Sequence, residues 1–577
     1  MRSPLPQPKF LPITAEEVRA LGWDPLDVVL VSGDAYVDHP SFGAAVIGRW
    51  LVAQGYRVGI LAQPDWKGPA GFRALGKPSL YFGVTAGVMD SMINKYTAQK
   101  KARSEDLYSP GGRPDMRPDR ASIVYANRVR EAFKDVPVIL GGVEASLRRL
   151  AHFDYWDDKV RRSVLLDAKA DLLVYGLAEE TIVGVTRTID EGKQAGAPWS
   201  ETLAKLRAMR GTASIVSKRE DAPAEAIVVA PYEKVSVDPA EYARVSRQFH
   251  LETNPLNARP LLQGHGDRFV LVQPPPLPLD EKKLDTVYEL PFRRAWHPSY
   301  TEPIPALEPV KFSVTIMRGC FGGCSFCSIT EHEGRAIQSR SEKSILKEIA
   351  SLKDVPGFTG VVSDIGGPTA NMWRMRCTLD TAEKVCRRLS CVHPKLCRHM
   401  EVVKPQDDLV QLMRKSRALP GVKRVLVASG VRYDLAVHNA DYMKELVTHH
   451  VGGHLKIAPE HVSPGVLMAM KKPEPEAYDE FERMFNQASR EAGKKQYLVP
   501  YFIGAHPGSK IEDMIEMALW LKRKGFRLRQ VQDFQPTPMT LSSTMFHTGI
   551  NPGTNEPVYV PRTMKEKKLQ KAFLRYH

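Results

Sequence analysis

The sequence predicts a mixed α/β protein, in which a doubly wound N-terminal α/β domain precedes a partial (β/α)6 barrel. Strand-like and helix-like patterns alternate along both halves of the 577 residues. Apolar residues make up 43% of the chain and charged residues 25%, which is ordinary globular composition. All seven cysteines lie between positions 320 and 397, so the second half carries the chemistry that thiols support.

In the first half, short apolar runs predict buried parallel strands at 27–32, 56–61, 80–84, 138–140 and 172–175. The stretch 42–54 has apolar residues at helical spacing, and Gly55 ends it. This rhythm predicts a doubly wound domain over residues 1–200. The basic, Gly/Pro-rich stretch 95–120 is predicted to be a long surface loop.

Residues 201–305 are predicted to form a connector, because the run 273–279 is rich in proline and cannot enter a central strand or helix. The barrel is predicted over 306–560 and a basic helical segment over 561–577. The expected barrel strands are 312–316, 361–362, 425–427, 455–457, 497–503 and 527–534, and the expected helices are 344–352, 441–449, 478–491 and 511–524.

Composition also bears on location and partners. No apolar run reaches the roughly 18 residues of a membrane span, and the N-terminus has no apolar core of signal-peptide length. We therefore expect a cytoplasmic protein without membrane contact. The formal net charge of +15 favours RNA or a ribosomal component over a small metabolite as partner. A basic surface with no anionic partner is the alternative.

The strongest signal is the spacing C-x3-C-x2-C formed by Cys320, Cys324 and Cys327. Thiolates are the soft ligands that iron–sulfur clusters require. Gly319, Gly322 and Gly323 allow a short loop to bring the sulfurs together, because glycine tolerates positive φ. Three thiolates leave one iron of a cubane open to another ligand. The alternative at this stage is a zinc site with His332 as a further ligand.

Four segments carry a resemblance: GCFGGCSFCSITEHEGRAIQSRS (319–341), ASGVRYD (428–434), HHVGGHLKIAPEH (449–461) and PYFIGAHPG (500–508). They resemble the YgiQ-type, or UPF0313, family of radical S-adenosylmethionine (SAM) proteins. The radical SAM resemblance covers about 306–560, and residues 1–300 resemble the N-terminal region of the same family.

The resemblance implies a radical SAM enzyme. Cys320, Cys324 and Cys327 would ligate a [4Fe-4S] cluster whose fourth iron binds SAM. An electron from the reduced cluster would split SAM into methionine and a 5′-deoxyadenosyl radical, which abstracts hydrogen from a substrate that the family does not identify. A flavodoxin or a ferredoxin-like protein would donate the electron.

The resemblance also implies SAM-binding residues. Phe326 would lie near the adenine, and the backbone of Gly366 and Gly367 would face the methionine amino group. Pro368 stands where the family usually has Glu, which puts a side-chain contact at that position in question. Ser429, with Gly430, would line the SAM site or else form a tight turn without a ligand.

Three further features leave alternatives open. Cys377, Cys386, Cys391 and Cys397 could hold a second cluster or a zinc ion, or act as small apolar residues.

The first half resembles the cobalamin-binding domains that precede some radical SAM barrels. His39, however, lacks the Asp-x-His-x-x-Gly spacing of those domains. We therefore expect a structural or substrate-contacting role for His39 rather than cobalt ligation. His461 or Glu460 could move protons or form hydrogen bonds near the cluster, and His506 could act in either of the same two ways.

A rival hypothesis for the whole chain is a non-catalytic iron–sulfur or zinc protein that acts in electron transfer or RNA binding.

Overall fold

The computed structural model describes residues 2–528 and 531–575. The chain divides into two compact units. The N-terminal unit comprises Met1–Glu241, Ala258–Leu277 and Val287–Lys311, and the C-terminal unit comprises Tyr242–Asn257, Pro278–Thr286 and Phe312–His577. Residues 529–530 of the last predicted strand and 576–577 of the predicted C-terminal segment lie outside the described residues.

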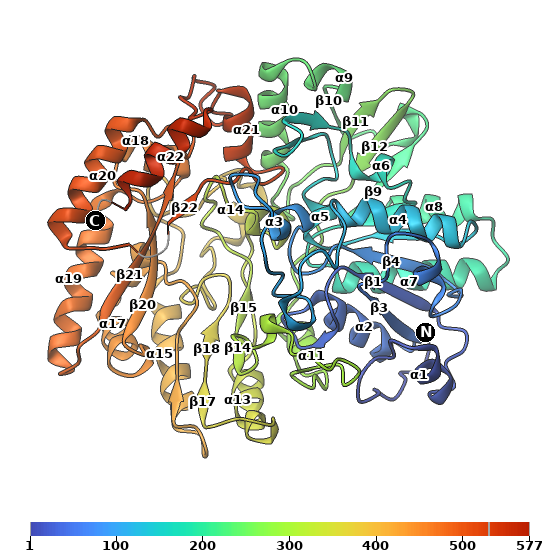
Figure 1. Ribbon diagram of the computed structural model, residues 1–577, viewed down its shortest axis with the longest axis horizontal. Coiled ribbons are helices and arrows are strands. Elements are labelled where there is room, and N and C mark those ends of the chain that lie inside the picture. Colours follow the sequence, from blue (N-terminus) through green and yellow to red (C-terminus); the bar gives the residue numbers. More distant parts are fainter. Residues whose placement is uncertain (1, 529–530, 576–577) are drawn as a thin grey trace. The chain divides into compact units, whose positions relative to one another are not determined.

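The N-terminal unit is built on one sheet of order β10-β11-β12-β9-β8-β5-β4-β1-β3. Its parallel part contains β3 (Val58–Ala62), β1 (Val28–Ser32), β4 (Tyr81–Thr85), β5 (Val138–Leu140) and β8 (Leu172–Val174). All five residues of β1 are buried, as expected for a strand covered on both faces. Helix α2 (Gly43–Ala53) packs on β3 and α7 (Glu179–Gln194), whereas α4 (Ala121–Ala132) packs on β4 and β5 (Figure 1). The predicted N-terminal α/β domain is confirmed.

The sheet continues into the stretch predicted as a connector. β9 (Thr212–Val216) runs antiparallel to β8, and β12 (Arg268–Val272) runs antiparallel to β9 and to β11 (Leu261–His265), which pairs with β10 (Ile227–Val229). Much of 201–305 therefore belongs to the sheet. β11 and β12 form a local hairpin, whereas the pairs β8–β9, β9–β12 and β10–β11 join strands that are far apart in the sequence, which local pattern does not reveal. The proline-rich run 273–279 has neither helix nor strand, as expected.

The stretch 95–120 is largely irregular, with a short 3-10 turn at Pro110–Gly112. It is not wholly a surface loop, which corrects the prediction. Arg117 is buried and pairs with Asp34 at 2.9 Å and with Asp106 at 3.0 Å. The loop therefore sends a charged side chain inward, where two carboxylates offset the cost of its burial.

His39 follows β2 (Val37–Asp38) and is buried. Its Nδ1 accepts a hydrogen bond from Ser41 N at 3.0 Å, and its Nε2 lies 3.1 Å from Arg294 Nη1. Both ring nitrogens thus have polar neighbours from the protein itself, which agrees with a structural role for this residue.

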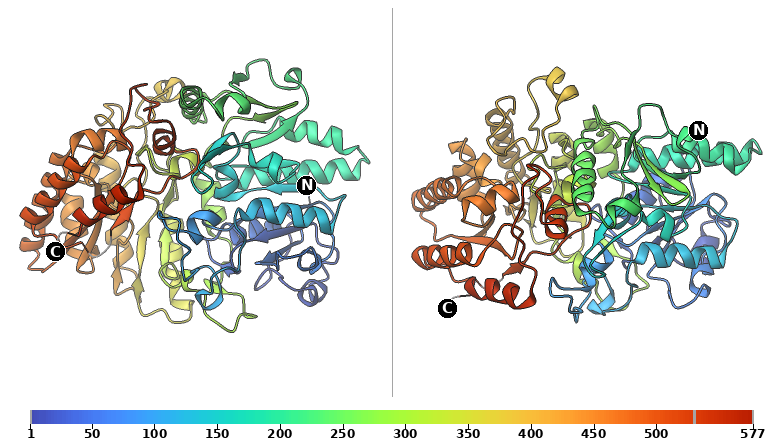
Figure 2. Two further views of the ribbon diagram at one scale, coloured as in Figure 1. Left: turned by 45° about the horizontal axis from the view of Figure 1, so that its top comes forward. Right: turned by 90° about the horizontal axis from the view of Figure 1, so that it is seen from above.

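The C-terminal unit carries short parallel strands separated by helices. β14 (Ser313–Thr315) pairs with β18 (Asp364–Gly366), β17 (Val361–Val362) pairs with β19 (Arg424–Val425), and β21 (Tyr497–Gly504) pairs with both β20 (His454–Glu460) and β22 (Gln532–Asp533). The helices that follow these strands flank them in each view (Figures 1 and 2): α13 (Glu342–Ser351), α15 (Val403–Arg417), α17 (Ala440–Glu445), α19 (Pro475–Glu491) and α20 (Ile511–Lys524). This succession of strand and helix agrees with the predicted partial barrel.

Shorter elements complete the two units. In the N-terminal unit they are α1 (Ala15–Ala20), α3 (Ser91–Lys95), α5 (Gly142–Ser146), α6 (Val164–Asp167), α8 (Trp199–Arg207), α9 (Tyr232–Val235), β6 (His152–Asp154), β7 (Lys159–Arg161) and β13 (Ala295–Trp296). In the C-terminal unit they are β15 (Met317–Arg318), β16 (Gln338–Ser339), α12 (Ile329–His332), α14 (Asp380–Val385), α16 (Tyr433–Ala436), α18 (Pro464–Met470), α21 (Leu541–Thr548) and α22 (Met564–Phe573). Helix α10 (Pro239–Leu251) begins in the N-terminal unit and continues in the C-terminal one, and α11 (Glu281–Tyr288) crosses from the C-terminal unit back to the N-terminal one.

Among the helices of the described residues, none combines the length and the apolar character needed to cross a lipid bilayer.

Candidate metal centre

The cysteine triplet lies on the loop between β15 and α12, which we call the cluster loop (residues 319–328). Two of its glycines are required by the backbone. Gly319 has φ 84° and a Cβ there would lie 2.2 Å from Ala336 O, and Gly323 has φ 63° and a Cβ there would lie 2.1 Å from Leu389 O. At these two positions the backbone of the loop therefore accepts glycine and no other residue.

Hydrogen bonds from neighbouring segments fix the loop. Cys320 N donates to Gly334 O at 3.1 Å. Ser390 Oγ donates to Gly322 O at 2.6 Å. The loop backbone is thus held from both sides, and its three cysteine side chains are half-buried.

The three thiols occupy one electrostatic environment. Burial, and then the neighbouring Cys324 and Cys320 thiols, raise the pKa of Cys327. Burial also raises the pKa of Cys320, while the Arg432 guanidinium opposes that rise. Metal binding favours the thiolate, so bound iron would reverse the effect of burial on these groups.

Arg432 donates from Nη1 to Cys324 Sγ at 3.6 Å. It is buried and pairs with Asp434 through Nε–Oδ1 at 2.8 Å and Nη2–Oδ2 at 2.6 Å. Its backbone N–H donates to Asn371 Oδ1 at 2.9 Å. Sequence reasoning did not single out Arg432, although the segment ASGVRYD that contains it was part of the resemblance.

In the part of the chain that the structure describes, no group of three or more His, Cys, Asp or Glu side chains is arranged around a single metal ion. A cubane makes a different demand, because each thiolate binds a separate iron. Three soft donors on one loop, with a guanidinium at one sulfur, fit an iron–sulfur cluster better than a single hard ion.

Two of the residues predicted to bind SAM, Gly366 and Ser429, are neighbours beside the first barrel strands. Gly366 ends β18, and a Cβ there would lie 2.8 Å from Ser429 Oγ. A Cβ on Gly367 would lie 2.4 Å from Met317 O, so the packing of neighbouring residues requires glycine at both positions. Ser429 is held by Asp364, which accepts from its backbone N–H at 3.0 Å and from its hydroxyl. Sequence reasoning missed Asp364, although it lies two residues before the Gly-Gly pair.

Phe326 and the residue after Pro368 make contacts of their own. The ring of Phe326 meets the ring of His506 edge-on at 6.1 Å. After Pro368, the next residue, Thr369, brings Oγ1 to 3.8 Å from Cys320 Sγ. A polar contact to the cluster loop is therefore present one residue beyond the position where the family usually has Glu.

The proton-transfer candidates at the end of β20 are buried. Burial raises the pKa of Glu460, whose φ is 71°. Burial lowers the pKa of His461 to about 4, and its Nδ1 accepts from Ser463 N at 3.0 Å. His461 is therefore neutral near neutral pH, with one ring nitrogen used by the local turn.

The second cysteine set lies on the irregular stretch around α14. Cys377 Sγ is 3.6 Å from Leu379 O, and Cys397 N donates to Cys391 O at 2.8 Å. Burial raises the pKa of Cys391, which Arg335 opposes and the Cys397 and Cys386 thiols reinforce. The structure thus joins Cys391 and Cys397 through a backbone hydrogen bond.

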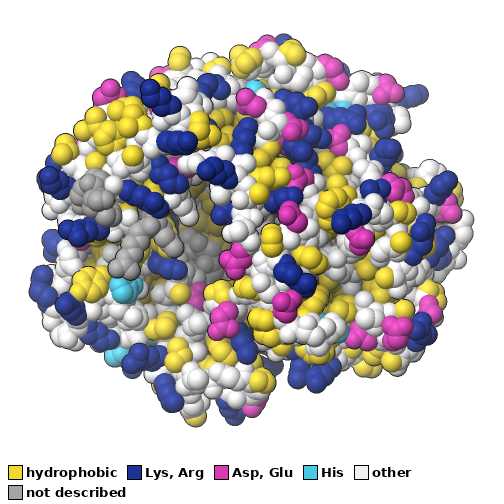
Figure 3. Space-filling view, in the orientation of Figure 1, with side chains coloured by type: hydrophobic (Ala, Val, Ile, Leu, Met, Phe, Trp, Pro, Cys, Tyr) yellow, Lys and Arg dark blue, Asp and Glu magenta, His cyan; other side chains and the backbone are white. Residues whose placement is uncertain are grey.

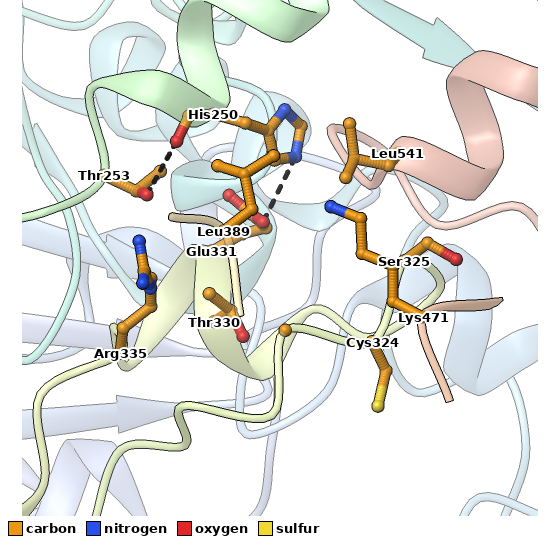
Figure 4. A pocket seen from close by; sticks show the side chains of 11 residues that line it. His250, Thr253, Cys324, Ser325, Thr330, Glu331, Arg335, Leu389, Lys471 and Leu541 are labelled. Atoms are coloured by element: carbon orange, nitrogen blue, oxygen red, sulfur yellow. Dashed lines mark hydrogen bonds and ion pairs between the residues drawn. The ribbon is translucent and has the colours of Figure 1, made fainter. Parts of the chain in front are cut away.

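A small polar cavity lies beside the cluster loop (Figure 4), lined in part by His250, Glu331, Arg335 and Lys471. Nδ1 of His250 lies 2.7 Å from the carbonyl of Ser246, and Nε2 lies 3.2 Å from Glu331 Oε1. Because a carbonyl only accepts, Nδ1 donates to it, and Nε2 faces the Glu331 carboxylate. The pair therefore places an imidazole beside a carboxylate at the cavity wall.

Lys471 projects into the same cavity from the end of α18, where it adopts φ 54°. Burial lowers the pKa of its ammonium to about 8, an effect that Glu331 opposes. In Figure 4 the sulfur of Cys324 points away from His250 and Glu331. The cavity thus lies on the side of the loop opposite this sulfur.

Comparison with family models divides the chain in three. Residues 10–313 match the radical SAM N-terminal model, residues 314–521 match the radical SAM superfamily model, and residues 529–577 match a domain of unknown function, DUF3362. The fold and the cysteine loop are thus those of a radical SAM protein.

Relatives narrow the class. A UPF0313 protein of Bradyrhizobium diazoefficiens is 55% identical, with 100% of this chain and 88% of that protein covered. The UPF0313 protein YgiQ of Escherichia coli K12 is 51% identical over 98% of this chain and 84% of its own length. This chain belongs to the UPF0313 family.

Among solved structures, the radical SAM methyltransferase TsrM of Kitasatospora setae, with cobalamin and a [4Fe-4S] cluster bound, aligns with a TM-score of 0.50. The two share 13% identity, and the alignment covers 89% of this chain and 77% of TsrM. At this identity the likeness concerns the fold alone, and it agrees with an α/β domain followed by a radical SAM domain.

Proposed function

We propose that this chain is a radical SAM enzyme in which Cys320, Cys324 and Cys327 ligate a [4Fe-4S] cluster. The observation that carries the proposal is the glycine-shaped loop of three thiols, with the Arg432 guanidinium 3.6 Å from Cys324 Sγ. Membership of the radical SAM superfamily supports it and implies both the cluster and SAM. When bound and reduced, the cluster supplies the electron that splits SAM into methionine and a 5′-deoxyadenosyl radical.

In this proposal the residues of the chain bind and orient SAM. Gly366 and Gly367 would present backbone to the methionine end of SAM, and a side chain at either position would collide with Ser429 or Met317. Ser429, which Asp364 holds through its backbone N–H, would line the same place, and Phe326 would lie near the adenine. Together these residues would hold SAM in one orientation next to the cluster loop.

The net charge of the chain bears on the class of substrate that the enzyme takes. The net charge of +15 supports RNA or a ribosomal component over a neutral metabolite. The flavodoxin or ferredoxin-like electron donor and the cytoplasmic location stay predictions from the sequence. The domain limits 1–200, 201–305, 306–560 and 561–577 likewise stay predictions.

A second metal at Cys377, Cys386, Cys391 and Cys397 also stays a prediction. The spacing of these four cysteines along one short stretch of the chain supports it. It predicts more than four irons, or a zinc ion, in each chain. Unchanged metal content after Cys391→Ala and Cys397→Ala would refute it.

The experiment that tests the main proposal measures 5′-deoxyadenosine. Anaerobically reconstituted, dithionite-reduced protein receives SAM and no other substrate. We expect product from the intact protein, loss of product in Cys324→Ala, and product in the control Ser351→Ala, whose side chain is exposed at the end of α13. A protein shown to hold four irons that makes no product, even when cell extract is added as a source of substrate, would favour the rival non-catalytic iron–sulfur role.

A further inference from the structure

The C-terminal segment, which matches a domain of unknown function, reaches the cluster loop. Ser542, in the first turn of α21, donates from its backbone N–H to Ser325 O at 2.8 Å. Its hydroxyl donates to Ser325 Oγ at 2.8 Å. Ser325 lies between the ligands Cys324 and Cys327, so α21 contacts the loop at the point between two cluster thiols.

The other polar atoms of Ser325 are bonded as well. Its N–H donates to Met470 O at 3.0 Å, and its hydroxyl donates to Ala469 O at 2.7 Å, both at the end of α18. Ser325 and Ser542 are 3% and 0% exposed, so water does not compete for these bonds. One residue of the cluster loop is thus held between α18 and α21.

Further hydrogen bonds support the contact between Ser542 and Ser325. His506 Nε2 lies 2.7 Å from Ser542 Oγ, and burial lowers the pKa of His506 to about 3. Gln570 of α22 holds the loop that carries His506, because its Oε1 accepts from Ala505 N at 2.9 Å and its Nε2 donates to Ser509 O at 2.8 Å. Both helices of the C-terminal segment therefore join one hydrogen-bond network.

We propose that α21 and α22 position the cluster loop, with Ser542 as the positioning residue. Glycines at 319, 322 and 323 leave the loop few side chains of its own to restrict its backbone, so restraint must come from outside it. Hydrogen bonds just beyond the ligands orient metal sites in this way. This inference rests on the proposed function, because it takes the loop to bind a cluster, and it assigns a role to the segment of unknown function.

The test compares Ser542→Ala with Ser543→Ala in reconstituted full-length protein. Ser543 is a matched control, because it is also a buried serine of α21 but bonds to Thr537 O at 2.6 Å, away from the cluster loop. We measure the rate of iron release to a chelator and the EPR spectrum of the reduced cluster. Loss of the buried hydroxyl that contacts Ser325 and His506 predicts release about three to ten times faster in Ser542→Ala. It also predicts a broadened spectrum in Ser542→Ala, with release in Ser543→Ala within about twofold of the intact protein.

Ser325→Ala approaches the same contact from the loop side and serves if Ser542→Ala does not fold. The double variant should show less than the sum of the two single effects, since both variants remove the bond between Ser325 and Ser542 and each also removes one further contact of its own. Equal release rates in the Ser542→Ala and Ser543→Ala proteins, or additive effects in the double variant, would overturn the inference. Intact protein that binds no iron–sulfur cluster would instead overturn the proposed function, so the two failures are distinguishable.

Discussion

Arg432 shows how much one side chain contributes to the candidate metal centre. It is 7% exposed, its charge is shared with Asp434, and its Nη1 lies 3.6 Å from Cys324 Sγ. A buried ion pair of this kind adds little stability by itself, because desolvation cancels much of the attraction. A cation at a cluster sulfur, however, favours the more negative, reduced state of the cluster.

Replacing Arg432 should therefore change both stability and potential. We expect Arg432→Ala to lower the free energy of unfolding by about 3–5 kcal/mol, because Asp434 is left buried without its partner. We also expect the reduction potential of the bound cluster to become more negative, measured by EPR-monitored redox titration. The exposed Arg424 of β19 provides the control, and Arg424→Ala should alter neither quantity. A potential in Arg432→Ala equal to that of the intact protein would contradict the assigned role.

At the scale of elements, the loop 96–120 closes the carboxyl end of the parallel strands in the N-terminal unit. α/β domains commonly bind ligands in that crevice, where the strand order reverses. Here Arg117 fills it, donating to Ala86 O at 3.0 Å and pairing with Asp34 and Asp106. Burial raises the pKa of Asp34 to about 6 in spite of this pairing. Ion pairs between buried side chains thus hold the loop 96–120 at the ends of these strands.

Removing Arg117 should therefore destabilise the N-terminal unit strongly. We expect Arg117→Ala to cost about 3–5 kcal/mol, since two buried carboxylates lose their partner. Arg113 of the same loop pairs with Glu302 at 3.1 Å, and their side chains are 57% and 46% exposed. Arg113→Ala should therefore cost less than about 1 kcal/mol. Urea unfolding at neutral pH measures both, and equal losses would show that burial of the pair is not what stabilises the loop.

For the whole molecule, the relevant quantity is the distribution of its charge. Lys and Arg side chains are scattered over the face drawn in Figure 3, with acidic side chains between them. Scattered positive charge attracts a polyanion without selecting its sequence, and salt screens such attraction.

We therefore expect RNA binding, if RNA is the partner, to be steeply salt-dependent. Each phosphate neutralised contributes about −0.7 to the slope of log K against log salt for single strands. Fluorescence anisotropy of a labelled RNA at about 50 and 200 mM salt would measure this slope, with a neutral sugar polymer as control. Binding that does not weaken with salt, or no binding at low salt, would remove the argument from charge.

Local pattern was sufficient to predict several strands and the class of protein that the cysteine spacing indicates. β5 and β17 have the bounds predicted for them, because short apolar runs between turns leave few other structures open. The spacing of Cys320, Cys324 and Cys327, together with the glycines, indicated the chemistry of the loop, because ligand spacing and backbone freedom are local properties. Family membership then confirmed the class of protein.

Tertiary structure alone decided the contacts between distant residues. Ser542 lies 217 positions from Ser325, and Arg432 lies 108 positions from Cys324. Strands β9 to β12 belong to a sheet that their own sequence does not predict. Arg117 lies in a crevice, although the sequence predicts that its stretch is a surface loop. The physical reason is the same throughout. Periodicity and spacing act between neighbours in sequence, whereas burial, ion pairing and strand pairing depend on which segments the folded chain brings together.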